Sequence, residues 1–266
     1  MRARQVRTVC DSSHCPNIGD CWGNGTATFM ILGGVCTRAC RFCAIHSGDP
    51  KGEVDLDEPK RVAMAVADLR LKHAVITSVT RDDVDDGGAS MFASTVREIR
   101  RLSPTTTIEL LIPDMRVEVG PLRTISKSCP DVIGHNIEVV RSLQHTTRDP
   151  KASYERSLSV LRLLKDLAPA TWTKTSLMLG LGEAREEVLQ AMRDARESGV
   201  DLLAIGQYLR PKGGSLPVTR YVAPEEFAEL RLEALRLGFA RVMTGPLVRS
   251  SFHAHDMIAE EEDSRC

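Results

Sequence analysis

Six of the chain's eight cysteines fall between residues 10 and 43, in two triplets of different spacing. The first triplet has the pattern C-x4-C-x5-C and the second has C-x3-C-x2-C; they consist of Cys10, Cys15 and Cys21, and of Cys36, Cys40 and Cys43. Three thiolates bind three irons of a cubane cluster and leave the fourth iron for another ligand. The triplets therefore predict two iron–sulfur clusters that differ in their fourth ligand.

Disulfide bonds and zinc are the alternative uses of clustered cysteines. Disulfide frameworks belong to short secreted chains, and this sequence shows no signal peptide and no apolar run long enough to cross a membrane. Zinc sites usually combine paired cysteine knuckles or cysteines with histidines. Zinc stays open because His14 and His46 lie close to the triplets in the sequence.

Composition points to one ordinary globular enzyme-sized domain. The chain has 266 residues, 42% of them hydrophobic, and a formal net charge of −1. This balance gives no reason to expect a nucleic acid or a membrane as a partner. Clustered free thiols indicate a reducing compartment, which is the cytosol or an organelle matrix, and we expect a cytoplasmic protein.

Apolar runs alternate with amphipathic stretches after the cysteine-rich start. The expected strands are Thr28–Leu32, Ala74–Val79, Thr107–Leu111, Val132–Gly134, Thr175–Met178, Leu202–Ile205 and Arg241–Met243. The expected helices are Pro59–Arg70, Ala89–Arg101, Val117–Lys127, Tyr154–Leu167, Glu183–Ser198 and Pro224–Leu237. Strands that alternate with helices of this length predict βαβ units and a parallel sheet. The fold class is therefore α/β, a partial or near-complete (β/α) barrel of the TIM type.

Active sites of such barrels lie at the carboxyl ends of the strands. The second triplet follows the first long strand after Gly33 and Gly34, which places it at that end. Polar loops that follow the later strands should converge there; they are residues 78–83, 135–138, 180–183 and 207–208. Each loop alone is also compatible with ordinary turn and capping chemistry.

The second triplet, with Phe42 before its last cysteine, resembles the signature of the radical S-adenosylmethionine (radical SAM) superfamily. In that superfamily the methionyl amino and carboxylate groups of S-adenosylmethionine bind the iron that lacks a cysteine. An electron from the cluster then releases a 5′-deoxyadenosyl radical. Such a cofactor is needed because acids and bases do not activate an inert C–H bond.

The first triplet and several further stretches are similar to the lipoyl synthase family. The similar stretches are RTVCDSSHCPNIGDCW (7–22), TSVTRDDVDDGGASMF (77–92), HNIE (135–138), RDPKASYERSL (148–158), KTSLMLGLGE (174–183), IGQYLRP (205–211) and GPLVRSSFHA (245–254). The resemblance spans residues 7–255. It implies that Cys10, Cys15 and Cys21 hold an auxiliary [4Fe–4S] cluster and that Ser251, from an Arg-Ser-Ser motif, supplies its fourth ligand. Phe252 departs from the tyrosine that the family usually has there, which keeps the ring and removes a hydroxyl.

The resemblance also implies the reaction and its partners. Two sulfur atoms enter C6 and C8 of an octanoyl chain carried on a protein lysine, two S-adenosylmethionine molecules are used per product, and the auxiliary cluster is consumed as the sulfur donor. The octanoylated carriers would be the E2 subunit of 2-oxoacid dehydrogenases and the glycine cleavage H protein. A low-potential donor such as ferredoxin or flavodoxin would supply electrons, and an iron–sulfur carrier would rebuild the spent cluster.

Residue roles and domain limits follow from the same resemblance. No side chain is expected to be catalytic itself, because the cofactor supplies the radical. Cys36, Cys40 and Cys43 should hold the catalytic cluster, and the residues expected to bind S-adenosylmethionine are Phe42, Ser78, Arg81, Asn136, Glu138 and Gln207. Three parts are expected: an auxiliary-cluster segment (1–27), the radical SAM barrel (28–244) and a tail that carries the Arg-Ser-Ser motif (245–266).

Two other functions stay open on the sequence. A different sulfur-inserting radical enzyme, such as one similar to biotin synthase, explains two clusters but not the C-x4-C-x5-C triplet with a serine partner. A non-enzymatic iron–sulfur scaffold or electron-transfer protein explains the cysteines alone. It has no need of polar loops at five strand ends.

Overall fold

A curved sheet of eight strands forms the centre of the protein in the computed structural model, which describes residues 6–12, 15–211 and 216–258. In spatial order the strands are β1 (Arg7–Thr8), β2 (Thr26–Ile31), β5 (His73–Ser78), β6 (Thr107–Leu111), β7 (Val132–Gly134), β8 (Trp172–Leu179), β9 (Leu202–Gln207) and β10 (Arg241–Gly245). From β2 to β10 every neighbouring pair is parallel, whereas β1 pairs antiparallel with β2.

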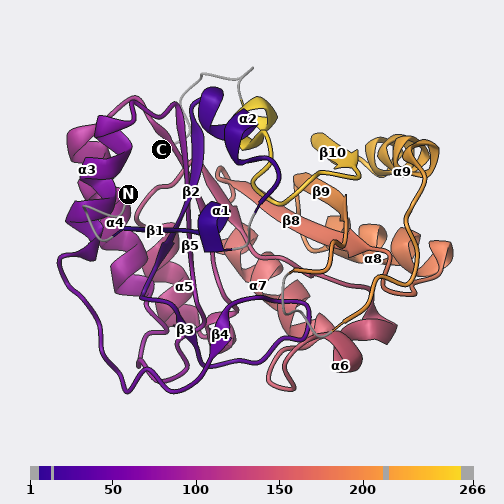
Figure 1. The fold of residues 1–266 in the computed structure, drawn as a ribbon, viewed down its shortest axis with the longest axis horizontal. Helices are drawn as coiled ribbons and strands as arrows, with labels where there is room; N and C mark the ends of the chain where they lie inside the picture. The colour runs from indigo at the N-terminus through magenta and orange to yellow at the C-terminus, as the bar shows by residue number, and fades with distance from the viewer. Residues whose placement is uncertain (1–5, 13–14, 212–215, 259–266) are drawn as a thin grey trace.

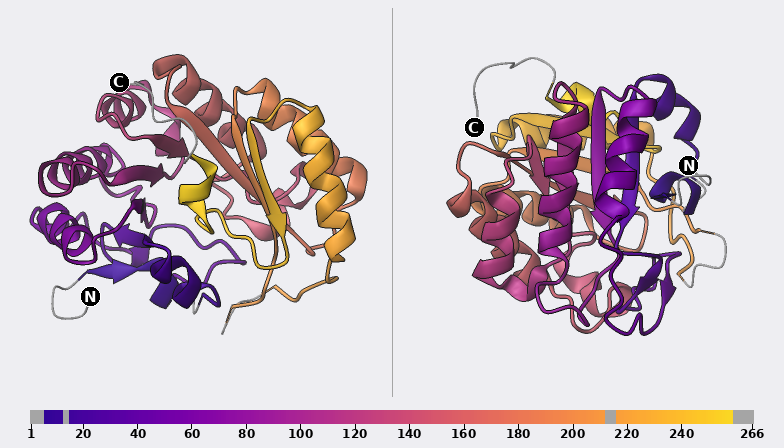
Figure 2. Two further views of the ribbon diagram at one scale, coloured as in Figure 1. Left: turned by 90° about the horizontal axis from the view of Figure 1, so that it is seen from above. Right: turned by 90° about the vertical axis from the view of Figure 1, so that its left-hand side faces the viewer.

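The longer helices cover the outer face of this sheet (Figures 1 and 2). They are α3 (Glu58–Asp68), α4 (Ala89–Leu102), α5 (Val119–Ser126), α7 (Tyr154–Leu167), α8 (Arg185–Glu197) and α9 (Pro224–Arg236). Short elements make up the rest: α1 (Val9–Ser12), α2 (Ile18–Gly23), β3 (Val35–Cys36), β4 (His46–Ser47), α6 (Gln144–Thr147) and the 3-10 turns η2 (Met115–Val117), η3 (Arg141–Leu143) and η4 (Ala254–Met257).

Local sequence explains where several helices begin and end. Pro224 opens α9, because a proline fits the first helical position, where no backbone donor is needed. Ser153 caps α7 by accepting a hydrogen bond from the backbone of Arg156. Gly199 and Gly238 follow α8 and α9 with φ of 83° and 89°, the left-handed conformation that ends helices at low cost.

The expected α/β fold is confirmed, as an open barrel. All seven expected strands are present, and β6 and β7 have the expected bounds. Among the described residues β10 pairs only with β9, so the sheet does not close onto β2. The helix expected from Val117 begins at Val119, because Met115, Arg116 and Val117 form a left-handed turn with φ between 45° and 61°.

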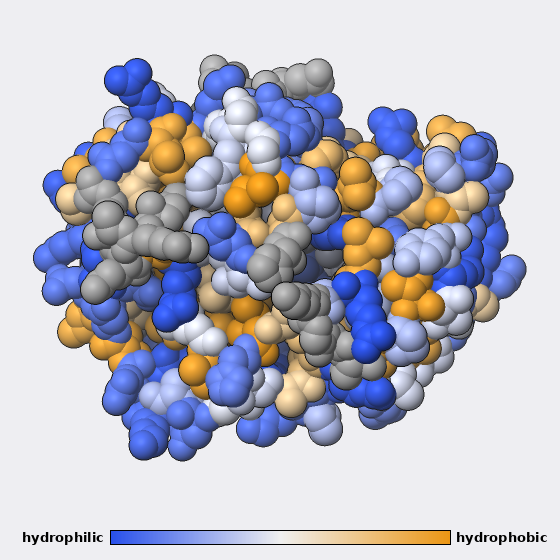
Figure 3. Space-filling model, viewed as in Figure 1, coloured by the Kyte–Doolittle hydropathy of each residue, from blue (hydrophilic) through white to orange (hydrophobic). Residues whose placement is uncertain are grey.

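Outward-facing side chains of the strands form the hydrophobic core with the helices. One cluster lies between β2, β5, β6 and helices α3 and α4, and a second lies between β8, β9 and helices α8 and α9. The face seen in Figure 3 is largely hydrophilic, with small groups of apolar residues between the charged ones. The helices on the outer face therefore bury the apolar side chains of these strands.

The interior of the barrel is polar near the amino ends of the strands. Lys174 lies 2.8 Å from Glu109, and both side chains are almost fully buried. His255 of η4 packs edge-on against His73, with ring centroids 6.3 Å apart. The turn η4 therefore covers this end of the barrel, inside the arc of strands (Figure 2).

Candidate active site

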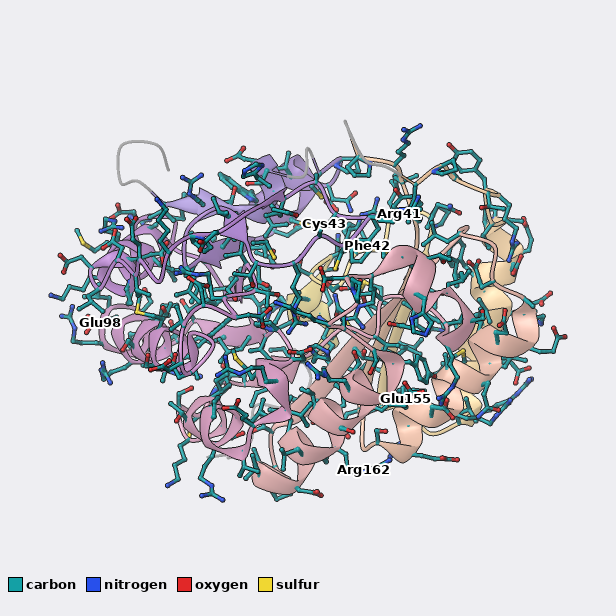
Figure 4. The ribbon with its side chains drawn as sticks, turned by 90° about the horizontal axis from the view of Figure 1, so that it is seen from below. Arg41, Phe42, Cys43, Glu98, Glu155 and Arg162 are labelled. Carbon is teal, nitrogen blue, oxygen red and sulfur yellow. The ribbon has the colours of Figure 1, made fainter. Side chains whose placement is uncertain are left out.

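The second triplet begins at the last residue of β3 and continues in the loop toward β4, over the carboxyl ends of the barrel strands. Figure 4 shows Phe42 and Cys43 over the interior of the arc, whereas Glu98 and Arg162 lie on the outer helices. Each of the three thiols accepts one backbone N–H: Thr80 to Cys36 (3.4 Å), Asp149 to Cys40 (3.4 Å) and Ile45 to Cys43 (3.5 Å). Hydrogen bonds of this kind stabilise the negative charge on the sulfur of a metal-bound thiolate.

Burial raises the pKa of the Cys40 thiol and raises that of Cys43 to about 11. The neighbouring thiols and the carboxylate of Glu138 raise both further, while Arg148 lowers the pKa of Cys40. The surroundings of these two thiols therefore favour the neutral, protonated form. A bound cation removes their protons, since metal coordination and deprotonation are linked. The donor set fits an iron–sulfur cluster.

A cavity of about 290 Å³ adjoins the second triplet, at the small end of the range for ligand pockets. Its lining includes four of the predicted cofactor-binding residues: Phe42, Ser78, Asn136 and Glu138. The hydroxyl of Ser78 is buried and has no hydrogen-bond partner within the described chain. An unsatisfied polar group in a cavity wall is what a site for a polar ligand contains.

Glu138 carries a carboxyl group in unusual surroundings. Burial raises its pKa, while Arg148 and a hydrogen bond from Asn136 lower it. Its backbone has φ of 72° and bridges to β8 through Ser176 and Met178, at 3.1 and 2.8 Å. A left-handed non-glycine residue held by a neighbouring strand is a strained feature that often marks a functional position.

Gln207 lines a second cavity of about 530 Å³, whose wall also includes Phe42 and Glu138. Its side-chain amide is bonded to backbone: Nε2 donates to the carbonyls of Tyr208 and Arg220, and Oε1 accepts from Val222. Gln207 therefore joins residues 220–222 to the end of β9.

Arg81 lies apart from both large cavities. Its guanidinium binds Asp83 at 2.8 Å and the carbonyls of Leu32 and Glu53. The loop at residues 180–183 lies behind Gln207, where Glu183 accepts the backbone N–H groups of Gly180 and Leu181. The cofactor-binding role of Arg81 stays a prediction, and its contacts are those of a residue that orders the loops.

The first triplet lies beside the end of the chain. Cys10 belongs to α1 and Cys21 to α2, and both line a cavity of about 20 Å³ together with Cys15, Arg249 and Ser251. The backbone of His253 donates a hydrogen bond to Cys21, although burial still raises the pKa of that thiol. Residues from both ends of the sequence thus surround one small space.

Two further residues of the site were not among the predicted site residues, although Arg148 opens the similar stretch 148–158. Arg148 lines the 290 Å³ cavity and is 9% exposed. The three side-chain hydrogen bonds that it makes to the described residues all start from Nη1, and its buried Nε has no acceptor among those residues. Arg38 lies inside the second triplet and is bonded to two carboxylates. The sequence alone does not predict that this arginine is buried, because the carboxylates that bind it lie far away along the chain.

The structure adds two observations on metals and membranes. Within residues 6–12, 15–211 and 216–258, no group of three or more histidine, cysteine or acidic side chains is placed to hold a single metal ion. His46 is exposed on β4, and His14 lies outside the described residues. No helix in the described part of the chain is long and apolar enough to cross a membrane.

Comparisons with known proteins agree with this geometry. The model of the radical SAM superfamily matches residues 30–195. The chain is 53% identical to a lipoyl synthase of Rubrobacter xylanophilus over 265 residues, covering 100% of this chain and 81% of the relative. It is 50% identical to that of Thermus thermophilus (98% and 80% covered) and 52% identical to that of Bacillus subtilis (100% and 89% covered).

Solved structures share the fold at low identity. The crystal structure of methylornithine synthase superposes with a TM-score of 0.60 at 13% identity, covering 90% of this chain and 77% of that one. Streptococcus suis SuiB bound to S-adenosylmethionine gives a TM-score of 0.61 at 10% identity, covering 94% and 57%. These likenesses support the α/β barrel-like fold of this chain.

Proposed function

The chain belongs to the lipoyl synthase family of the radical SAM superfamily, and we propose that its two cysteine triplets hold two [4Fe–4S] clusters with different tasks. The enzyme is a radical SAM sulfurtransferase that inserts two sulfur atoms at C6 and C8 of a protein-bound octanoyl-lysine to make the lipoyl cofactor. Its cofactors are [4Fe–4S] clusters and S-adenosylmethionine. Lipoyl synthases that are about half identical to this chain over nearly its whole length argue against both alternative functions, a biotin-synthase-like enzyme and an iron–sulfur scaffold or electron-transfer protein.

Cys36, Cys40 and Cys43 hold the cluster that works with S-adenosylmethionine. When both groups are bound, they supply the 5′-deoxyadenosyl radical that breaks the C–H bonds. The observation that carries this assignment is the set of three N–H donors, one to each thiol, beside the 290 Å³ cavity. The chain's part is to bind, orient and exclude water, since the cofactor does the chemistry.

Cys10, Cys15, Cys21 and Ser251 hold the second cluster, which is a substrate because it provides the sulfur. Ser251 borders the small cavity beside all three cysteines and also the two large cavities, so the sulfur source would face the acyl chain. A serine oxygen is a harder ligand than a thiolate and is lost more readily from iron. Such a ligand suits a cluster that is dismantled during each reaction.

Polar residues of the 290 Å³ cavity hold S-adenosylmethionine. Ser78, Asn136 and Glu138 offer a hydroxyl, an amide and a carboxylate, and Phe42 offers a ring. Arg148 adds a cation whose free Nε suits a carboxylate. Arg81 and Gln207 act by ordering the loops around the site, because their polar atoms are bonded to the protein. The 530 Å³ cavity takes the octanoyl chain.

The finer partners and the division of the chain belong to the same proposal. The octanoyl carriers are the E2 subunits of 2-oxoacid dehydrogenases and the glycine cleavage H protein. Ferredoxin or flavodoxin gives electrons, an iron–sulfur carrier restores the spent cluster, and the enzyme works in the cytoplasm. The auxiliary segment covers residues 1–27, the barrel residues 28–244 and the tail residues 245–266.

Cysteine variants separate the two clusters. After anaerobic reconstitution, Cys36→Ala should form neither 5′-deoxyadenosine nor thiolated octanoyl peptide. Cys10→Ala should still form 5′-deoxyadenosine but no thiolated peptide. Cys129→Ala, at an exposed cysteine outside both triplets, is the control. Thiolated peptide from the Cys10 variant, measured by mass spectrometry, would refute the division of tasks.

A further inference from the structure

The three residues between Cys36 and Cys40 fasten the cluster loop to the ends of three strands. The backbone and side chain of Thr37 both donate to the Thr80 carbonyl, at 3.0 Å each, just after β5. The backbone of Ala39 donates to Asp149 at 2.9 Å, in the segment that follows β7 and α6. Arg38 binds Asp82, which follows β5, and Asp114, which follows β6. The three residues between Cys36 and Cys40 thus hold the cluster loop against the barrel, besides setting the spacing of the two cysteines.

Arg38 is held by two carboxylates in a buried site. Nη1 and Nη2 bind the two oxygens of Asp114 at 2.7 and 2.8 Å, and Nε and Nη2 bind those of Asp82 at 3.1 and 3.0 Å. The side chains of Arg38 and Asp114 are 5% and 2% exposed. Burial alone would raise the pKa of Asp114, but the hydrogen bonds from Arg38 outweigh it and bring the pKa to about 2. Two bidentate contacts of this kind fix position and angle together.

The two carboxylates are themselves fixed. Asp114 accepts the backbone N–H of Arg116 at 3.1 Å, within the left-handed turn that follows β6. Asp82 lies after β5 and is bonded at its backbone to the hydroxyl of Thr37. A strained turn persists only where its surroundings determine it, so Asp114 has little freedom to follow Arg38 if the loop moves. The contacts that hold Arg38 are therefore rigid on the barrel side.

From this geometry we infer that Arg38 is a positioning residue, which sets the height and orientation of the three-cysteine loop over the 290 Å³ cavity. This inference rests on the proposed function of the second triplet. Arg38 lines that cavity along with the cysteines, so a change in its contacts moves the cavity wall as well as the loop. A displacement of about 1 Å is enough to lower a reaction rate about 100-fold when reacting groups must meet in one geometry.

Arg38→Lys tests the geometry apart from the charge, because a lysine keeps the cation and loses the fork of donors. The reconstituted full chain should keep its iron content. The change that S-adenosylmethionine causes in the electron paramagnetic resonance spectrum of the reduced cluster should be lost or broadened. Thiolated peptide should fall about 10- to 100-fold. The control is Arg100→Lys, in a half-exposed pair with Asp131 at the amino end of β7, where the loss should stay within about twofold.

A second variant tests the same inference in case Arg38→Lys does not fold. Thr37→Val removes the hydroxyl bonds to the Thr80 carbonyl and Asp82 while keeping the shape of the side chain. It should disturb the spectrum in the same direction. A wild-type spectrum and yield in both variants would overturn the positioning role. Wild-type values of both readouts in Arg38→Lys alone would overturn it too, because the positive charge of Arg38 would then be its only contribution. If the wild-type protein itself shows no response to S-adenosylmethionine, the proposed function fails instead.

Discussion

The imidazole of His253 lies 2.7 Å from a carboxylate oxygen of Asp20, which joins the end of the chain to the helix that carries Cys21. A second contact joins the same two segments: the side chain of Asn17 donates to the Leu247 carbonyl at 2.7 Å, across 230 residues of sequence. The position of Ser251 beside the first triplet therefore depends on contacts that α2 makes with the tail.

Asn17→Ala should loosen the tail and lower the occupancy of the first cluster. The side chain of Asn17 is 5% exposed, and the loss of its hydrogen bond to the tail costs about 0.5–1.5 kcal/mol. Reconstituted protein should bind less iron and form less thiolated peptide, while 5′-deoxyadenosine formation continues. Thr124→Ala, which removes an exposed hydrogen bond within α5 far from the first triplet, is the control and should bind iron like the wild type. Equal iron in both variants would contradict the dependence on the tail.

Ser251→Ala should act on sulfur insertion and leave radical formation in place. Of the two adjacent serines, only Ser251 borders the cavity that contains all three cysteines of the first triplet, whereas Ser250 borders the larger cavities alone. Removing the hydroxyl should change the Mössbauer spectrum of one cluster and lower the thiolated product at least about tenfold. Ser250→Ala is the matched control. A larger loss of product with Ser250→Ala than with Ser251→Ala would show that Ser250, and not Ser251, is the ligand.

Gly206→Ala should push the tail away from β9. A Cβ atom at Gly206 would lie 2.0 Å from the Val248 carbonyl oxygen, a backbone atom that moves only with the tail. Overpacking of this kind costs about 1–3 kcal/mol, so the melting temperature and the iron content should both fall. Gly120→Ala in α5 is the control, because nothing lies within 4 Å of its Cβ position and alanine favours a helix. Unchanged iron binding by Gly206→Ala would refute the close contact.

The sequence predicted the barrel well because most strands are short apolar runs between clear stop signals. β6 and β7 have the expected limits, but β2 begins two residues earlier than expected, at Thr26. The two-residue strand β1 and the turn η4 escaped prediction because neither has a periodic pattern. Each exists through its contacts with β2 or with the barrel interior.

The candidate site divides in the same way. Cysteines stand out because their spacing along the chain carries the chemistry, and the structure gathers each triplet beside a cavity. Arg38 and Asn17 carry no local signal, since their partners lie 76 and 230 residues away. The cofactor-binding role of Gln207 and Arg81 stays a prediction. Their positions at strand ends suggested it from the sequence, and in the structure their polar groups are bonded to other parts of the protein.

His135 should make the folded protein less stable below neutral pH. Burial lowers its pKa to about 4, with help from Arg148, and the ring is bonded to the Ile112 carbonyl at 2.9 Å and to the Ser157 hydroxyl at 3.1 Å. Because the folded pKa lies below the unfolded value of about 6.5, the unfolded chain binds more protons in between. The stabilisation is complete above about pH 6.5 and is lost as the pH falls toward 4, by about 2 kcal/mol at about pH 5.

Urea unfolding of the wild type and of His135→Gln, at about pH 7.5 and about pH 5, measures this contribution. The variant should be less stable at the higher pH, because glutamine does not reproduce both ring contacts. It should lose about 2 kcal/mol less than the wild type on acidification, since no imidazole remains there to be protonated. His46→Gln, on the exposed strand β4, controls for the loss of a histidine as such. Parallel curves for the wild type and His135→Gln would show that the ring is already charged in the folded state, and the assignment of the neutral form would be wrong.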